Sequence, residues 1–150
     1  MTAYPDTSFL CAFYRLQYNS TQAASLMQKA TEPLSVSTLL LFEFRHSTRL
    51  QVWLNQKDRT RGFTAPEGVK MLAALQSDLS TGVLKLVAAD WADVHAIAER
   101  LSAQYCQAAG HRALDTMHVA TALHFGAKAF LTFDANQRRL AKAEKLEVKP

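Results

Sequence analysis

The sequence predicts an α/β layer fold in which a mainly parallel sheet lies between helices, because short apolar runs alternate with longer stretches of helical periodicity. The run Ala129-Phe-Leu-Thr-Phe133 is typical of a buried parallel strand, and Gly126 is placed to end the helix before it. Strands that alternate with helices favour parallel pairing, because a crossover helix brings the next strand back in the same direction. In such folds, functional sites form beyond the carboxyl ends of the strands.

Capping residues mark where several helices begin and end. Thr64 and Glu67 have the spacing of a capping box, Asp90 is placed to cap the helix after it, and Gly82 is placed to end one. Pro5 cannot donate a backbone hydrogen bond, which limits the pairing of the first strand. We expect strands before Asp6 and at residues 34–37, 83–88, 129–133 and 146–149, and helices at residues 9–14, 21–29, 39–55, 65–81, 91–109, 111–125 and 136–145.

The composition excludes several classes of protein. The chain has 150 residues, 49% of them hydrophobic, so we expect residues 1–150 to form a single domain with its own core. Two cysteines are too few for a disulfide framework and match no zinc spacing, which favours a reducing cytoplasm. No segment has the roughly 20 apolar residues that a membrane span needs. The net charge of +4 favours an anionic partner such as RNA, although a solvated basic surface explains it equally well.

Acidic residues follow the predicted strands or begin the next helices. Asp6 follows the first strand, Glu43 lies early in the helix after the second, Asp115 lies in the first turn of a helix, and Asp134 follows the fourth strand. In a parallel sheet these positions can share one edge. Neighbouring carboxylates repel one another and stay ionised only if a cation neutralises them, and oxygen ligands suit Mg²⁺ or Mn²⁺ better than zinc. This set indicates metal-assisted hydrolysis of a phosphodiester.

Each acid also has an ordinary structural explanation. Asp6 and Asp134 can be helix N-caps, because aspartate is favoured there. Asp115 can satisfy the helix dipole or pair with Arg112 or His111. Glu43 can be a solvated helix residue, although its apolar neighbours make free exposure less natural. Only the arrangement of all the acids favours a metal site.

Short motifs surround these acids and follow one another along the chain. They are Asp6-Thr7-Ser8, Leu41-Phe42-Glu43-Phe44-Arg45, Leu114-Asp115-Thr116-Met117-His118-Val119-Ala120-Thr121-Ala122-Leu123 and Leu131-Thr132-Phe133-Asp134. Their combination and order, which extend from one end of the chain to the other, resemble the PIN-domain ribonucleases and in particular the VapC-type toxins of bacterial toxin–antitoxin systems.

The resemblance implies a fold, an activity and partners. The fold is a PIN-like three-layer α/β/α sandwich with a mainly parallel central sheet. The activity is an endonuclease that cuts RNA and depends on Mg²⁺ or Mn²⁺. The partners are a second copy of the chain and a small antitoxin that inhibits the enzyme. Matched position by position, the family's acidic metal ligands correspond to Asp6, Glu43, Asp115 and Asp134, and its hydroxyl beside the metal corresponds to Thr7 or Ser8.

Basic residues near the acids are candidates for contacting RNA. Arg112 lies one turn before Asp115, and Arg138 and Arg139 follow Asp134 closely. A guanidinium group suits a phosphate oxygen, although solvation alone explains many surface arginines. His118 can line the site or pack in the core.

The middle of the chain carries apolar residues whose role the sequence leaves open. Trp53 and Phe63 flank a charged loop and can contribute to a dimer or antitoxin surface, although burial in the core is the simpler interpretation for Trp53. In the next helix, the spacing predicts that four residues face inward: Val69, Leu72, Ala73 and Leu79.

We therefore expect a metal-dependent endoribonuclease that is the toxin of a toxin–antitoxin pair. The alternative is a non-catalytic RNA- or protein-binding module on the same fold, in which the acids cap helices and bind no metal. A phosphatase with Asp6 as nucleophile is disfavoured, because Ser8 stands where a second aspartate would act as acid or base.

Overall fold

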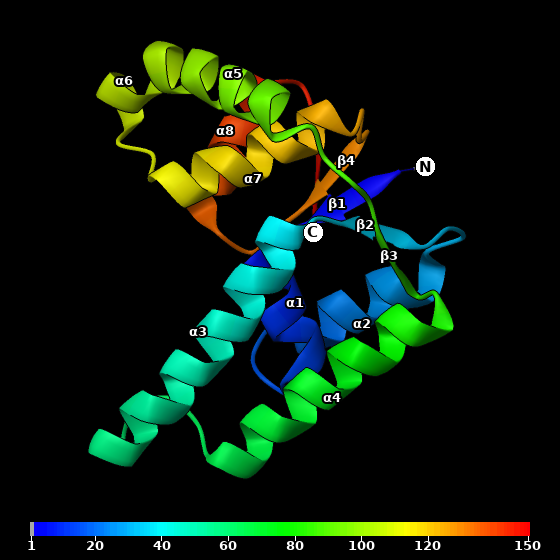
Figure 1. Ribbon diagram of the computed structural model, residues 1–150, viewed down its shortest axis with the longest axis vertical. Helices are drawn as coiled ribbons and strands as arrows, with labels where there is room; N and C mark the ends of the chain where they lie inside the picture. Colours follow the sequence, from blue (N-terminus) through cyan, green and yellow to red (C-terminus); the bar gives the residue numbers. More distant parts are fainter. Residues whose placement is uncertain (1) are drawn as a thin grey trace.

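The structure is a computed structural model that describes residues 2–150 (Figure 1). Its strands are β1 (Ala3–Pro5), β2 (Leu34–Val36), β3 (Leu84–Leu86), β4 (Ala129–Leu131) and β5 (Glu147–Lys149). Its helices are α1 (Thr7–Tyr14), α2 (Ser20–Lys29), α3 (Thr38–Lys57), α4 (Ala65–Thr81), α5 (Trp91–Leu101), the π-helical segment η1 (Ser102–Cys106), α6 (Gln107–Ala109), α7 (Ala113–His124) and α8 (Ala135–Ala143). Every predicted helix and strand is present, and η1 interrupts the helix predicted at residues 91–109.

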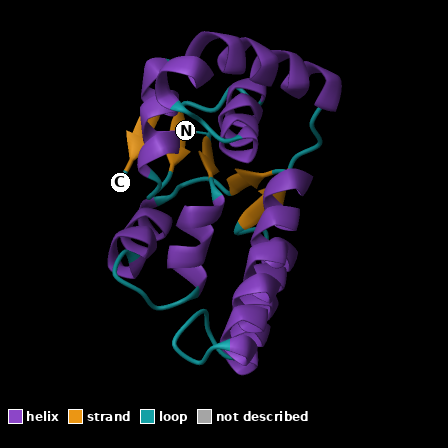
Figure 2. Cartoon of the chain, turned by 90° about the vertical axis from the view of Figure 1, so that its left-hand side faces the viewer, coloured by secondary structure: helices purple, strands orange, loops and turns teal. Residues whose placement is uncertain are grey.

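The elements form three layers. Short parallel strands lie in the middle, with α5, α7 and α8 on one side and α1, α2 and α4 on the other (Figures 1 and 2). Large buried side chains from all three layers form the core, among them Tyr4, Phe9, Phe44, Leu75, Leu101, Phe130 and Leu140. The predicted α/β/α fold with a mainly parallel sheet is therefore confirmed.

The strands form two hydrogen-bonded units, one in the order β1-β4-β5 and one that pairs β2 with β3. β1 and β2 are neighbours, but no backbone ladder joins them. The Asp6 N–H donates to the Leu131 carbonyl at 3.0 Å, so the alternation of groups along β1 turns the nitrogen of Pro5 toward β2. Because proline has no N–H, β1 cannot donate to β2 at that position. Pro5 was predicted to limit the hydrogen bonding of the first strand. In the structure this limit applies only to the side of β1 that faces β2.

Helices α3 and α4 pack as a hairpin that extends away from the sheet (Figure 1). The close approach depends on Gly68 of α4, where a Cβ atom would lie 2.7 Å from the side chain of Val52 in α3. Leu75 is fully buried, whereas Val69 and Ala73 are exposed. The predicted inward face of α4 was therefore wrong for these two residues, because the helix turns its glycine side toward α3.

The remaining expectations concern single residues and the membrane. Phe63 is buried, but the Trp53 side chain is 50% exposed, so its burial in the core was the wrong interpretation. Cys11 and Cys106 are both free thiols. Within residues 2–150, no helix has the length and apolar character to cross a membrane.

A pair of glycine substitutions tests the turn between α3 and α4. Gly62 (φ +58°) and Gly82 (φ +80°) both have left-handed backbones, but a Cβ atom on Gly62 would lie 2.0 Å from the Gln51 carbonyl oxygen, whereas Gly82 faces open space. We expect Gly82→Ala to lower the free energy of unfolding by about 1 kcal/mol, the cost of the backbone conformation alone. Gly62→Ala should lower it by about 3 kcal/mol or more, because overpacking adds to that cost. Urea unfolding measures both, and equal losses would contradict the described turn.

Candidate active site

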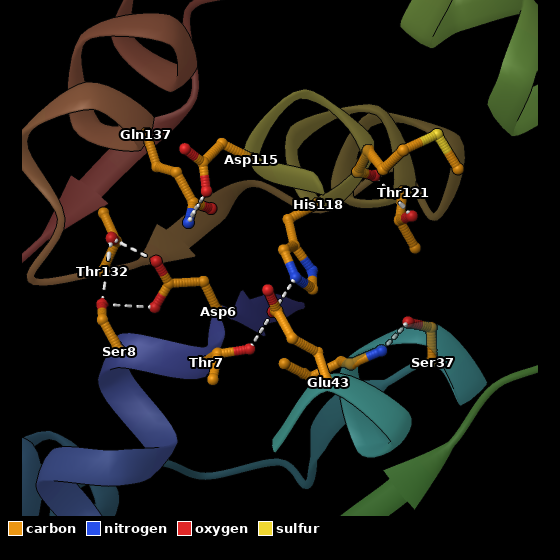
Figure 3. A network of polar contacts seen from close by, with 12 residues as sticks. Asp6, Thr7, Ser8, Ser37, Glu43, Asp115, His118, Thr121, Thr132 and Gln137 are labelled. Carbon is orange, nitrogen blue, oxygen red and sulfur yellow. Dashed lines mark hydrogen bonds and ion pairs between the residues drawn. The ribbon is translucent and has the colours of Figure 1, made fainter. Parts of the chain in front are cut away.

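The predicted acids lie around the carboxyl ends of β1 and β4, and Figure 3 shows three of them, Asp6, Glu43 and Asp115. Asp6 directly follows β1, and Asp134 follows β4 after a short turn. Asp115 projects from the first turn of α7, and Glu43 projects from α3 toward the same region. Each position follows from the parallel topology, which brings the ends of these strands and the starts of these helices to one edge.

Asp6 is fully buried and caps α1. Its Oδ1 accepts hydrogen bonds from the Phe9 N–H at 2.9 Å and the Ser8 hydroxyl at 2.7 Å, and its Oδ2 accepts one from the Thr132 hydroxyl at 2.5 Å. Burial raises the pKa of Asp6, although these donors favour the ionised form. The cap interpretation of Asp6 is therefore correct, and it does not exclude a role in a site.

The hydroxyls that hold Asp6 also shape the turn after β4. The Ser8 Oγ accepts from the Phe133 N–H, and the Thr132 Oγ1 accepts from the Asp134 N–H, both at 2.9 Å. Through these two hydroxyls, the buried carboxylate of Asp6 positions the backbone that carries Asp134.

Glu43 points inward and forms polar contacts with two elements. Its Oε2 accepts a hydrogen bond from the Thr7 hydroxyl and lies 2.5 Å from His118 Nε2 (Figure 3). Burial alone would raise the pKa of Glu43, but the hydrogen bonds and charge of His118, together with Thr7, lower it overall. Glu43 is therefore held as a carboxylate at a defined position.

His118 is fully buried and connects Glu43 to the start of α3. Its Nδ1 lies 3.3 Å from the Tyr4 hydroxyl, which lies 2.9 Å from the Ser37 hydroxyl. Ser37 also caps α3 by accepting from the Leu40 N–H at 3.1 Å. Burial raises the pKa of Tyr4, so its hydroxyl stays protonated as a partner for His118 and Ser37.

Asp115 and Asp134 share a neighbour, Gln137. The Gln137 side chain donates to Asp115 Oδ1 at 3.1 Å, and its backbone N–H donates to Asp134 Oδ1 at 2.8 Å, which makes Asp134 the cap of α8. The pKa of Asp115 is raised by burial and next by the negative charge of Asp134, while Arg112 opposes this shift. Two like charges therefore lie close together at this end of the sheet.

The acids do not form a ready coordination sphere. Among residues 2–150, no group of three His, Cys, Asp or Glu side chains is arranged closely enough to hold a metal ion. Asp6 and Glu43 are engaged with separate partners, and Asp115 contacts Gln137. The site consists of two hydrogen-bonded networks at one sheet edge. One connects Asp6 through Thr132 to Asp134 and through Gln137 to Asp115, and the other holds Glu43.

The predicted RNA-contacting arginines differ in their surroundings. Arg138 is partly buried and donates to the Thr132 carbonyl at 3.2 Å, and Arg139 donates to Asn136. Arg112 is exposed at the start of α7, where its charge acts on Asp115. Arg112 is thus the best placed of the three to contact an anionic ligand.

The sequence interpretation missed several polar residues of this region. It gave no role to Tyr4, Thr132 or Gln137. For His118 it left two possibilities open, that the side chain lines the site or that it packs in the core. The sequence spacing could have identified Gln137, because it stands three residues after Asp134. At that spacing the backbone N–H donates to the side chain of the residue that caps the helix. The contacts of Tyr4 with Ser37 and His118, and that of Thr132 with Asp6, join residues far apart in the chain, so the spacing of neighbouring residues could not predict them.

Comparisons with known proteins identify the family to which the chain belongs. A family model described as PIN domain matches residues 3–143. No curated protein matches the chain.

Three solved structures have the same fold. The VapC20 toxin of Mycobacterium tuberculosis, described as cleaving the sarcin–ricin loop, is 21% identical with a TM-score of 0.67, over 99% of this chain and 100% of its own. FitAcB from Neisseria gonorrhoeae is 18% identical with a TM-score of 0.62, over 99% and 97% of the two chains. VapBC2 from Rickettsia felis, bound to a promoter DNA fragment, is 13% identical with a TM-score of 0.66, over 99% and 98%. At these identities the likeness concerns the fold, and the family model establishes that the chain belongs to the PIN domain family.

Proposed function

We propose that this protein is a metal-dependent endoribonuclease that hydrolyses RNA phosphodiester bonds and acts as the toxin of a toxin–antitoxin pair. The observation that carries this proposal is the set of acids Asp6, Glu43, Asp115 and Asp134 around one sheet edge of a PIN domain. The description of VapC20 as a toxin that cleaves the sarcin–ricin loop supports it. A small antitoxin, a second copy of the chain and a cytoplasmic location belong to the same proposal.

The donor set fits Mg²⁺ or Mn²⁺. The candidate ligands are carboxylate oxygens, and both ring nitrogens of His118 already face Glu43 and Tyr4. The charge of Asp134 raises the pKa of Asp115, so a cation beside both would relieve their repulsion. We propose Asp6, Glu43, Asp115 and Asp134 as the ligands, with Thr7 or Ser8 as the supporting hydroxyl. Because no three of these side chains are grouped closely enough among the described residues, the side chains would have to draw together when the cation binds. When bound, the cation would activate water and stabilise charge on the phosphate.

The chain's own residues define the rest of the mechanism. His118 and Thr7 hold Glu43 as an oriented carboxylate, which can accept a hydrogen bond from an attacking water. Arg112 is exposed beside Asp115 and can bind a phosphate oxygen. Arg138 and Arg139 remain secondary candidates for RNA contacts, because each already donates within the chain.

A second candidate function rests on a specific observation. Asp6 and Asp134 both accept hydrogen bonds as helix caps, and no three-ligand group is assembled among the described residues. These contacts also suit a non-catalytic RNA- or protein-binding module on the same fold. Metal binding discriminates between the two functions.

Calorimetric titration with Mn²⁺ provides that test. We expect wild-type protein to bind Mn²⁺, and Asp115→Asn to bind it more weakly, because the variant removes an anionic ligand. Chelation should abolish RNA cleavage, and added Mg²⁺ should restore it. Absence of Mn²⁺ binding to the wild type would favour the binding module.

Substitution of the buried acid tests catalysis separately from folding. Asp6→Asn should lower cleavage of structured RNA by about 100-fold or more, since changes even to partners of metal ligands cost 10- to 100-fold. Asparagine can still cap α1 through its single acceptor oxygen, so the variant should fold. Its amide nitrogen replaces the acceptor of the Thr132 hydroxyl, so we expect a modest fall in the melting temperature that is too small to explain the loss of cleavage. Asp90→Asn, which changes the exposed cap of α5, is the matched control and should leave cleavage unchanged. Full cleavage by Asp6→Asn would contradict the mechanism.

The raised pKa of Asp6 also predicts a pH dependence of stability. Without metal, the folded protein holds the Asp6 proton more tightly than the unfolded chain does, so Asp6 lowers the free energy of unfolding as pH rises from about 4, the unfolded pKa, through the raised folded pKa. The stability of Asp6→Asn relative to wild type should therefore increase over this pH range. Urea unfolding in a chelating buffer measures the difference. A constant difference would show that burial does not perturb Asp6.

A further inference from the structure

We propose that one face of α3 binds single-stranded RNA next to the cleavage site, an inference that rests on the proposed ribonuclease function. The face is a row of residues at spacings of four, three, four and four, so that they share one side of the helix. We call this row the α3 stripe, and it consists of Phe42, His46, Arg49, Trp53 and Lys57.

The stripe faces solvent along its whole length. All five residues are exposed, and the two large apolar side chains, Phe42 and Trp53, are exposed by 64% and 50%. The opposite side of α3 is buried through Leu40, Phe44 and Thr48. The aromatic residues of the stripe are therefore not needed for the core of this chain.

The charge of the stripe favours an anionic partner. Glu43 is the single acid in the sequence of α3, and its carboxylate points away to Thr7 and His118. Among residues 2–150, neither Arg49 nor Lys57 forms an ion pair with a carboxylate. The positive charges of the stripe thus remain available to phosphate groups.

Its aromatic rings suit nucleobases. The rings of Phe42 and His46 are stacked, with centroids 5.7 Å apart and planes 24° from parallel. The Lys57 ammonium lies 6.0 Å from the centre of the Trp53 ring, which places a positive charge beside a second flat surface. Alternating rings and positive charges are the arrangement by which proteins bind single strands, since bases stack on the rings and phosphates pair with the charges.

The stripe begins on the turn of α3 that also carries Glu43, and the side chains of Phe42 and Glu43 leave that turn in different directions. Phe42 directly precedes Glu43, and α3 runs from there away from the sheet (Figure 1). From Phe42 to Lys57 the helix rises about 22 Å, at 1.5 Å per residue. Beside the stripe, a groove of about 300 Å³ between α3 and α4 is lined by Arg49, Trp53 and Gly68, among others. A strand cut near Glu43 can therefore follow α3 for several nucleotides.

RNA binding without cleavage tests the inference. We would measure the fluorescence anisotropy of a short fluorescein-labelled single-stranded RNA of mixed sequence with Asp6→Asn protein as the parent. Adding Arg49→Glu or Trp53→Ala should weaken binding about tenfold each, and Arg49→Glu should also reduce the salt dependence of binding. The matched controls are Lys85→Glu on β3 and Tyr18→Ala in the turn before α2, both exposed and outside the stripe. Both controls should bind like the parent.

A cleavage assay with protein that keeps the native Asp6 distinguishes failure of this inference from failure of the proposed ribonuclease function. If the wild type does not cut RNA with Mn²⁺, the proposed function fails. If the wild type cuts RNA but both stripe variants bind as tightly as the parent, the stripe inference fails and the surface belongs to a protein partner. A changed molar mass of the stripe variants in light scattering would also overturn the inference, in favour of a second copy of the chain.

Discussion

The hydrogen bonds that enclose the Asp6 carboxylate hold the carboxyl end of the sheet together. A fully buried carboxylate is costly unless donors surround it, and here the donors come from α1 and from the turn after β4. The same hydroxyls then accept from the backbone of Phe133 and Asp134. One anionic group thus determines where two segments meet that are more than 100 residues apart in the chain.

Glu43 is held by a second network that shares no hydrogen bond with the first. His118 and Tyr4 connect it to Ser37, and Ser37 caps the helix that carries Glu43. The acid and the start of its own helix are therefore positioned by one chain of polar contacts. In the proposed mechanism, this keeps Glu43 oriented without the help of a ligand.

Local patterns predicted much of this fold. Capping residues such as Thr64 and Asp90 fixed helix starts, and the apolar run at residues 129–133 marked a buried strand, because these signals act between near neighbours. The parallel topology then placed the acids at one edge. The inward face of α4 was misjudged, since the packing of Gly68 on Val52 depends on another helix. The local patterns indicated no role for Thr132 and no definite role for His118, because the partners of both, Asp6 and Glu43, are distant in the chain.

The missing N–H of Pro5 has a consequence for how the molecule opens. With no backbone ladder between β1 and β2, the two strand units are joined across this boundary by side chains, including the Tyr4–Ser37 hydrogen bond. The His118–Glu43 contact ties α7 to α3, the helix that follows β2, near the same boundary. Local unfolding that parts the two units would therefore dismantle the candidate site at the same moment. A ligand that bridges the acids would therefore oppose the separation of the two strand units. As the fraction of protein with bound ligand rises, the fraction that opens at this boundary would fall.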